Sequence, residues 1–224
     1  MNRRRPTLLA ALALTAATAL TLSACGSGDE EGSAKDKDSD KIAGADTGSE
    51  KSAPPSEPSA SAAAGRPKIE LPSDLSYTFD WPKTGDKEKD AILADGEQSI
   101  KAVDLAITNQ DALDRGYLYY YEGEGAAVTQ KFIQNYVDHK AGLTGSYRFY
   151  APVVAVGKNG TGSLSYCEDQ GKAYVKYLET GKVKKTEVTE ESYVIYHTSL
   201  KKNDEGAWVI HKIVSERGSA KCQP

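Results

Sequence analysis

The sequence is poor in the residues on which metal and nucleophile chemistry depend. Among 224 residues there are three cysteines, three histidines and one methionine. The cysteines form no CxxC pair and no histidine pair lies near them, so the ligand spacing of a zinc site is missing. The chain also lacks a glycine-rich phosphate loop and a nucleophile elbow. We therefore expect no metal, no cofactor and no catalytic set that a motif could assign.

An excess of positive charge is missing as well. The chain carries 28 Lys and Arg against 32 Asp and Glu, which gives a formal net charge of -4. A general nucleic-acid binder would be basic, so we expect no nucleic-acid partner. Tyrosine dominates the aromatic residues, with 13 Tyr against three Phe. This bias indicates many half-buried positions where a ring packs and its hydroxyl stays wet.

An apolar run with a cysteine at its end marks the N-terminus. The run from Leu8 to Leu22 is about 15 residues, short of the ~20 that a membrane-spanning helix needs, and Arg3–Arg5 precede it. Leu22-Ser23-Ala24-Cys25 resembles the lipobox of bacterial lipoproteins. The resemblance implies that residues 1–24 are a signal peptide and that the Cys25 thiol is diacylated, because two acyl chains are needed for stable anchoring. The alternative is a plain signal peptide with an incidental cysteine.

The composition divides the remaining chain into a tether and a domain. Residues 25–68 consist almost entirely of Gly, Ser, Ala, Asp, Lys, Glu and Pro, which cannot bury enough apolar surface to fold. A flexible segment of about 40 residues has a root-mean-square reach of roughly 35 Å. Residues 69–224, roughly 155 in number, suit a single domain with a real core.

Helical periodicity is confined to the first half of this domain. Ile69–Trp81 is expected to be an extended lead-in. Apolar residues then recur at helical spacing over Lys87–Thr108 and again over Ala127–Lys140, with Gly142 as the stop. Asn109–Gly125 between them is less regular.

The second half has the pattern of an antiparallel sheet. Asn159-Gly160 predicts a tight turn, and Pro152 indicates an edge strand or a bulge. The expected strands are Tyr147–Val156, Leu164–Cys167, Lys172–Leu178, Ser192–Leu200 and Ala207–Ser215, with Lys182–Val188 as a further candidate. Helices followed by such strands predict an α+β fold with N-terminal helices packed on one face of a curved antiparallel sheet.

Two cysteines remain after Cys25. An even pair in an exported protein indicates a disulfide, here Cys167 with Cys222. It would close a loop of about 55 residues, worth roughly 4 kcal/mol in the chain-entropy treatment. Free thiols or metal ligands are the alternative.

The last strand carries a resemblance to a known family. It opens with Gly206-Ala207-Trp208-Val209-Ile210 after a pair of helices and a meander, which resembles the nuclear transport factor 2-like (cystatin-like) superfamily. Tyr166-Cys167-Glu168-Asp169 with the C-terminal cysteine, the lipobox and the tether is similar to small lipoproteins of Gram-positive bacteria. The family resemblance implies a cone with a pocket between the helices and the concave sheet. Isomerases, cyclases and non-enzymatic binding or scaffold domains all use this cone.

Several aromatic residues are candidates for the pocket or its rim. They are Tyr119, Tyr120, Tyr136, Tyr196 and Trp208. The alternative for the tyrosines around Tyr119 is packing where helices meet the sheet.

Acid–base candidates are few. Asp138 and His139 end the second predicted helix, and His197 and His211 lie on the last two strands; no spacing among them matches a family motif. A hairpin loop of Asn203–Glu205 would place His197 opposite His211, whereas one more loop residue would put them on opposite faces.

These features together favour a binding or scaffold module in the cell envelope, anchored to the extracytoplasmic face of the membrane. Its partner would be another envelope protein or a small apolar ligand, and a homodimer is a family-level expectation. The alternative is a pocket enzyme of the isomerase or cyclase type, or a small-ligand carrier. An apolar cavity enclosing a carboxylate or histidine with tyrosine donors would favour the enzyme; a cone filled with side chains would exclude it.

Replacing Cys25 tests the anchor. We expect Cys25→Ser to release the chain from the membrane fraction or to leave an uncut precursor, because serine offers no thiol for acylation. Fractionation with mass spectrometry of the N-terminal peptide measures this. Unchanged processing and acylation in the variant would defeat the lipobox interpretation.

Overall fold

A curved sheet of six strands and three helices make up residues 65–224, the part of the chain that this computed structural model describes. The signal peptide, Cys25 and nearly all of the expected tether lie outside these described residues. The helices are α1 (Lys87–Thr108), α2 (Arg115–Tyr120) and α3 (Gly123–Asp138). The strands are β1 (Leu75–Phe79), β2 (Ala141–Val156), β3 (Thr161–Tyr177), β4 (Val183–Lys184), β5 (Tyr193–Lys202) and β6 (Trp208–Arg217). No helix within this range is long and apolar enough to cross a membrane.

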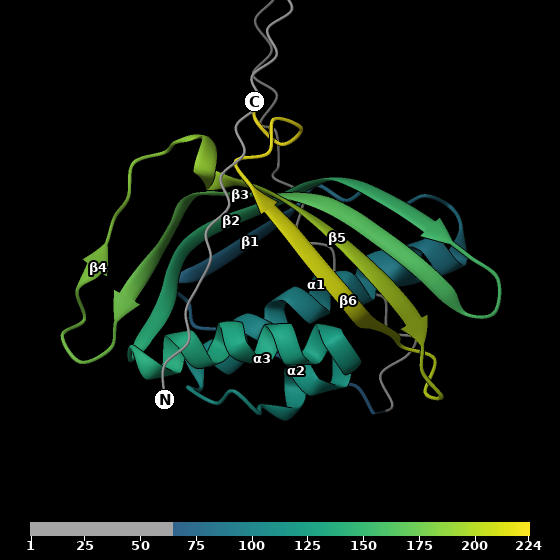
Figure 1. Cartoon of the computed structure of the whole chain (residues 1–224), viewed down its shortest axis with the longest axis horizontal. Coiled ribbons are helices and arrows are strands. Elements are labelled where there is room, and N and C mark those ends of the chain that lie inside the picture. The colour runs from purple at the N-terminus through teal and green to yellow at the C-terminus, as the bar shows by residue number, and fades with distance from the viewer. Residues whose placement is uncertain (1–64) are drawn as a thin grey trace, which may run out of the picture. The chain divides into compact units, whose positions relative to one another are not determined.

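The sheet arches over the helices, which pack on its concave face (Figure 1). Its strand order is β1-β2-β3-β5-β6, and β4 pairs only with β3. The expected α+β fold class is confirmed, with one correction. β1 lies within the expected lead-in and runs parallel to β2, so the sheet is mixed rather than wholly antiparallel. A five-residue strand flanked by prolines gave no clear periodic signal, and its pairing with β2 supplies the backbone partners that hold it extended.

Helix α1 has the bounds that its sequence predicts. Asp86 caps it, because its carboxylate accepts hydrogen bonds from the backbone N–H groups of Glu88 and Lys89. The apolar side chains at helical spacing are buried, Ile92 and Ile107 completely. The apolar periodicity was enough to predict both ends.

The chain between the two predicted helices is more ordered than expected. It contains α2, and α3 begins at Gly123 rather than at Ala127 and ends at Asp138. The first turn of α3 carries Gly125, where an added Cβ would lie 2.7 Å from the carbonyl oxygen of Ile210. The helix thus starts against the backbone of β6, a contact that glycine permits and that periodicity does not reveal. The stop is Lys140, at φ +46°; Gly142 lies within β2.

Strands β2 and β3 are longer than the sequence predicts, with 16 and 17 residues. β3 is continuous, so the expected break at Asp169–Gly171 is absent. At Pro152 β2 pairs only with β3, because β1 pairs with β2 no farther than Phe149, and a register shift between Tyr150 and Val153 makes this stretch a bulge. The tight turn at Asn159-Gly160 is confirmed by their φ values of +59° and +69°.

The pairing of β5 with β6 corrects the expected register. Lys202 pairs with Trp208, and a bulge at His211 shifts the register between Ser199 and Leu200. His197 therefore lies opposite Val214, not His211. Because one extra residue exchanges the faces of a strand, Lys212 and Val214 share a face with His197 instead of facing the helices.

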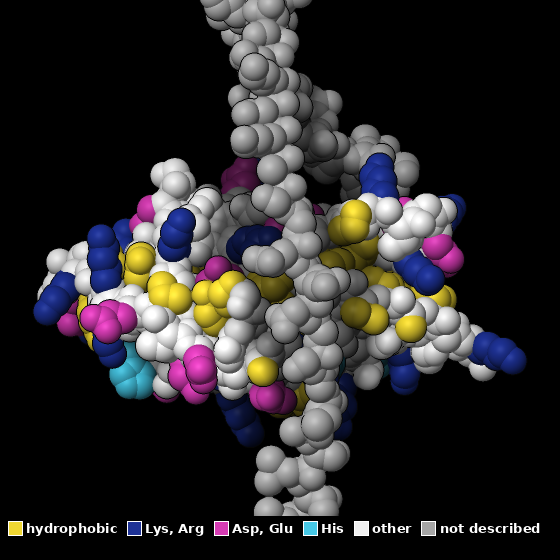
Figure 2. Space-filling model, turned by 90° about the horizontal axis from the view of Figure 1, so that it is seen from above, with side chains coloured by type: hydrophobic (Ala, Val, Ile, Leu, Met, Phe, Trp, Pro, Cys, Tyr) yellow, Lys and Arg dark blue, Asp and Glu magenta, His cyan; other side chains and the backbone are white. Residues whose placement is uncertain are grey.

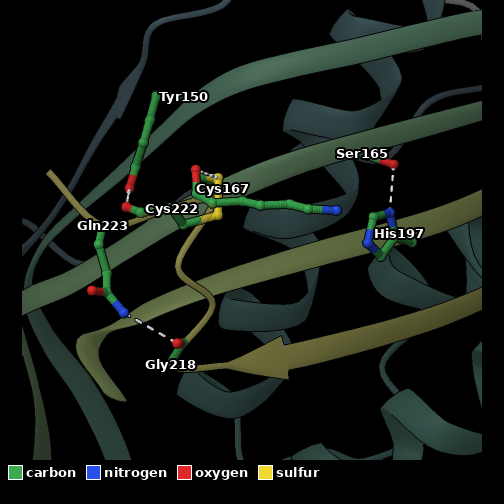
Figure 3. Close-up of a disulfide and its surroundings, with 8 residues drawn as sticks. Tyr150, Ser165, Cys167, His197, Gly218, Cys222 and Gln223 are labelled. Carbon is green, nitrogen blue, oxygen red and sulfur yellow. Dashed lines mark hydrogen bonds between the residues drawn. A yellow bond between two sulfur atoms is a disulfide. The ribbon is translucent and has the colours of Figure 1, made fainter. Parts of the chain in front are cut away.

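The expected disulfide between Cys167 and Cys222 is present, on the outer face of the sheet, away from the helices (Figure 3). Both cysteines are buried together with Ile195 in a small cluster separate from the main core. The Tyr150 hydroxyl donates to the carbonyl oxygen of Cys222, and the Gln223 amide donates to that of Gly218. These contacts hold the C-terminus on β3.

One buried carboxylate joins three parts of the domain. Asp95 of α1 is 1% exposed and forms an ion pair with Arg66, which precedes β1. Its second oxygen accepts a hydrogen bond of 2.8 Å from the backbone N–H of Trp208, the first residue of β6. The end of the expected tether, the longest helix and the last strand are thus tied at one point.

Removing this carboxylate should cost more stability than removing a half-buried one on the same helix. We expect Asp95→Ala to lower the free energy of unfolding by about 3 kcal/mol, since it leaves the Trp208 N–H buried without an acceptor and frees Arg66. Glu97→Ala is the control and should cost less than about 0.5–1 kcal/mol, because Glu97 pairs with Lys101 at the surface. Urea titration measures both values; equal losses would contradict the role assigned to Asp95.

Candidate ligand cavity

A cavity of about 880 Å³ opens between the helices and the concave face of the sheet. Its walls come from α1, α3, four strands of the sheet and the segment from β4 to the start of β5. The N-terminal half of α1 packs tightly against Leu164 and Trp208, whereas its C-terminal half, from Ile100 to Asp104, faces the cavity. The cone is therefore packed at one end and open at the other.

Aromatic rings form a row across the concave face. Phe79, Phe149, Tyr166 and Tyr196 come from β1, β2, β3 and β5, with successive ring centroids 4.7, 6.0 and 5.1 Å apart. Residues on neighbouring strands that point to one face form such cross-strand pairs. The aromatic residues that line the cavity are Tyr121, Phe132, Tyr136, Tyr147, Phe149, Tyr166, Tyr174 and Tyr196.

Two carboxyl groups lie among these rings. The first is Asp104 of α1, 8% exposed, which accepts a 2.7 Å hydrogen bond from the Tyr77 hydroxyl. Burial raises the pKa of Asp104 to about 7; the Tyr77 bond opposes this rise, and the nearby Glu168 adds to it. At neutral pH this side chain is therefore divided between its acid and carboxylate forms.

The second is Glu168 of β3, which is 6% exposed. Burial raises its pKa, while hydrogen bonding with Gln170 and Tyr196 and the charge of Arg217 lower it. The same burial, with Asp104 and Glu168 nearby, raises the pKa of Tyr147, so its phenol stays protonated. The site thus combines two carboxyl groups with phenol donors in an apolar setting.

The mouth of the cavity has a different character. Val128 and Phe132 on α3 line it and are 48% and 49% exposed. Lys184 and Arg217 are the basic side chains of the lining, and both are exposed. The Arg217 guanidinium donates to the carbonyl oxygen of Glu191 at 2.7 Å.

The aromatic candidates divide between the two ends of the cone. Tyr136 and Tyr196 line the cavity. Tyr119, Tyr120 and Trp208 do not: Tyr120 and Trp208 are buried in the packed core, and Tyr119 packs against Tyr120.

Sequence reasoning missed Asp104 and Glu168. A signal for Asp104 existed, since it directly follows Val103 on the apolar stripe of α1. For Glu168 the signal was its alternation with Tyr166 along β3. Neither signal was decisive. An acidic residue next to apolar residues of a helix or strand usually lies at the edge of the buried face, where its carboxylate reaches solvent.

The acid–base candidates named from sequence lie outside the cavity. Asp138 and His139 are exposed at the end of α3. His197 is exposed on the outer face and bonds Ser165 at 2.7 Å (Figure 3), and His211 contacts Glu122. Within residues 65–224 no group of three or more His, Cys, Asp or Glu side chains could hold a metal ion.

The outer face of the sheet offers no comparable feature. Val153 of β2, 68% exposed, lies on this face and pairs with Ser165. Figure 2 shows the visible part of this face as small, separate groups of hydrophobic side chains with charged side chains between and around them.

Comparison with known proteins adds a likeness in fold. No family model and no curated protein matches the chain. A ketosteroid isomerase-like protein from Erwinia carotovora atroseptica aligns over 60% of this chain and 98% of its own, with 14% identity and a TM-score of 0.40. An NTF-2 like protein of unknown function from Shewanella oneidensis covers 55% and 98% with 16% identity and a TM-score of 0.35. A cystatin-like domain of unknown function from Nostoc punctiforme covers 61% and 79% with 17% identity and a TM-score of 0.37. Likeness at this level says nothing of activity.

The raised pKa of Asp104 has a consequence for stability. Since the folded chain holds this proton up to about pH 7 and the unfolded chain releases it near pH 4, unfolding becomes easier as the pH rises through that window. We expect Asp104→Asn, which cannot ionise, to reduce the loss of stability between pH 4.5 and 7.5 by roughly 2–4 kcal/mol.

Denaturant unfolding across this pH range measures the effect. Glu216→Gln is the matched control, since Glu216 is exposed on β6 and away from the cavity. A wild-type profile and an Asp104→Asn profile that run parallel would refute the assignment.

Proposed function

We propose that this chain is a lipid-anchored extracytoplasmic protein, of the type found in Gram-positive bacteria, whose domain binds a small and largely apolar molecule. The observation that carries the proposal is the cavity of about 880 Å³ lined by aromatic rings and two buried carboxyl groups. Its volume lies within the range of roughly 300–1,000 Å³ that small-molecule sites occupy.

The energetic cost of such a space supports a ligand-binding role. Protein interiors pack as densely as organic crystals, and an unfilled apolar space forfeits the contacts that would stabilise the fold. Larger side chains on α1 or α3 could have closed the cone. Several apolar walls with a few polar groups are the usual composition of a site that binds and orients a small molecule.

The anchor rests on the lipobox and on the tether that follows it. A reach of roughly 35 Å would keep the cavity close to the membrane surface, where apolar molecules partition. A scaffold role for another envelope protein finds less support, since the exposed apolar side chains of the outer face are scattered.

A second candidate is proton transfer within the cavity, as in an isomerase or cyclase. It is favoured by Asp104, because a general acid or base works best when its pKa is near the ambient pH. Tyr77 would hold the Asp104 carboxyl in place, and phenols such as Tyr147 would stabilise a developing oxyanion. The enzyme alternative was expected to require an apolar cavity that encloses a carboxylate with tyrosine donors, and this cavity has those features.

Native mass spectrometry of the chain purified from its own cells tests the binding role. We expect a bound small molecule that leaves on denaturation. Ala173→Trp should reduce its occupancy at least about tenfold, because Ala173 lines the cavity and an indole would fill part of it.

Ala155→Trp is the matched control, since Ala155 is exposed and does not line this cavity. Circular dichroism establishes that both variants fold. Equal loss of the molecule in both variants, or an empty wild-type chain that also binds no apolar probe, would count against the proposal.

A further inference from the structure

The charges around the cavity are unbalanced. Five acidic residues line it against two basic ones. The acidic residues are the buried Asp104 and Glu168 and the exposed Glu124, Glu187 and Glu191. The basic ones, Lys184 and Arg217, are both exposed at the mouth, and Arg217 already bonds the carbonyl oxygen of Glu191.

No cation within the described residues pairs with the Asp104 carboxyl group. Asp104 is hydrogen-bonded to the neutral Tyr77, and the other groups whose charge couples to it are phenols and a second carboxyl. These are Tyr121, Tyr136, Tyr147, Tyr166 and Glu168. An unpaired buried carboxylate is costly, so a positive charge brought beside it would be stabilised.

The negative charge of Glu168 is partly offset by neighbouring groups. Gln170 donates a 2.9 Å hydrogen bond to it, and Tyr196 bonds it. Arg217 acts on it through charge, with Asp169 opposing. Glu168 lines the same cavity as Asp104, so both carboxyl groups contribute negative charge to it when they are ionised.

The aromatic rings of the cavity also favour a positively charged ligand. The face of a tyrosine or phenylalanine ring carries negative potential and attracts ammonium groups, most strongly where water is excluded. The concave wall presents several such rings next to both carboxyl groups. Carboxylates surrounded by aromatic rings are suited to an organic cation, whose apolar body the rings also hold.

We propose that the ligand of this cavity is an organic cation, an amine or quaternary ammonium group on an apolar ring or chain, with its charge beside Asp104 and Glu168. This inference rests on the proposed binding function and specifies its ligand class. A neutral ligand with a carbonyl group would instead need Asp104 in its protonated form as a donor. The two classes therefore differ in the direction of their pH dependence.

A pair of probes of equal shape distinguishes them. Benzyltrimethylammonium carries a permanent charge, and neopentylbenzene is its neutral carbon counterpart. Calorimetry with the purified full-length chain at pH 5.5 and pH 8 compares their affinities. We expect the cation to bind about tenfold or more tightly at pH 8, where Asp104 is ionised, and the neutral probe to bind equally or less tightly there.

Three variants locate the charge. Asp104→Asn and Glu168→Gln should each weaken binding of the cation at pH 8 about tenfold while sparing neopentylbenzene. Glu216→Gln removes the same charge from the outer face of β6 and should leave both affinities unchanged. If Asp104→Asn fails to fold, the wild-type pH profile and Glu168→Gln still decide.

The outcomes separate this inference from the binding role. Neopentylbenzene binding as tightly as the cation at pH 8 would overturn the inference and leave the cavity as a site for neutral molecules. Binding of neither probe would overturn both. A cation affinity that rises with pH and depends on both carboxyl groups would support it.

Discussion

Helix α1 buries two aspartates, and the structure of the domain depends on which groups pair with each buried carboxylate. Asp95 meets the Arg66 guanidinium and the N–H of Trp208, so its charge is paired and its oxygens are used. About two and a half turns later, Asp104 meets only a neutral phenol. Since a buried charge is stable only with a partner, Asp95 fixes structure, whereas Asp104 can gain or lose a proton near neutral pH.

The curvature of the sheet places the two aspartates at different ends of the cone, one packed and one open. Irregularities bend the long strands: a bulge near Pro152 in β2, another at His211 in β6, and Gly145, at φ +103°, where an added Cβ would lie 2.1 Å from the Lys172 carbonyl oxygen. At the Asp95 end the curved sheet closes on α1, with Trp208 and Leu164 in the core. At the Asp104 end the rings of the concave wall border open volume.

Ligand binding and proton transfer would both depend on the burial of the two carboxyl groups in the cavity. Burial makes ionisation of Asp104 and Glu168 costly, and it strengthens any interaction that depends on their charge. A cation would be favoured by the ionised forms, and a carbonyl group by the protonated ones. An envelope location would expose this balance to the external pH, which cells control less closely than their cytoplasm.

The sequence by itself determined the local features: both ends of α1, the Asn159-Gly160 turn, the opening of β6 near Trp208, the cysteine pair and the α+β class. Each follows from periodicity, turn chemistry or composition, which act over a few residues. Only the tertiary structure decided the parallel β1, the bulge at His211 and the placement of Asp104 and Glu168 in one cavity. These depend on contacts between segments far apart in the chain, and one added residue in a strand reverses which side chains face the cavity.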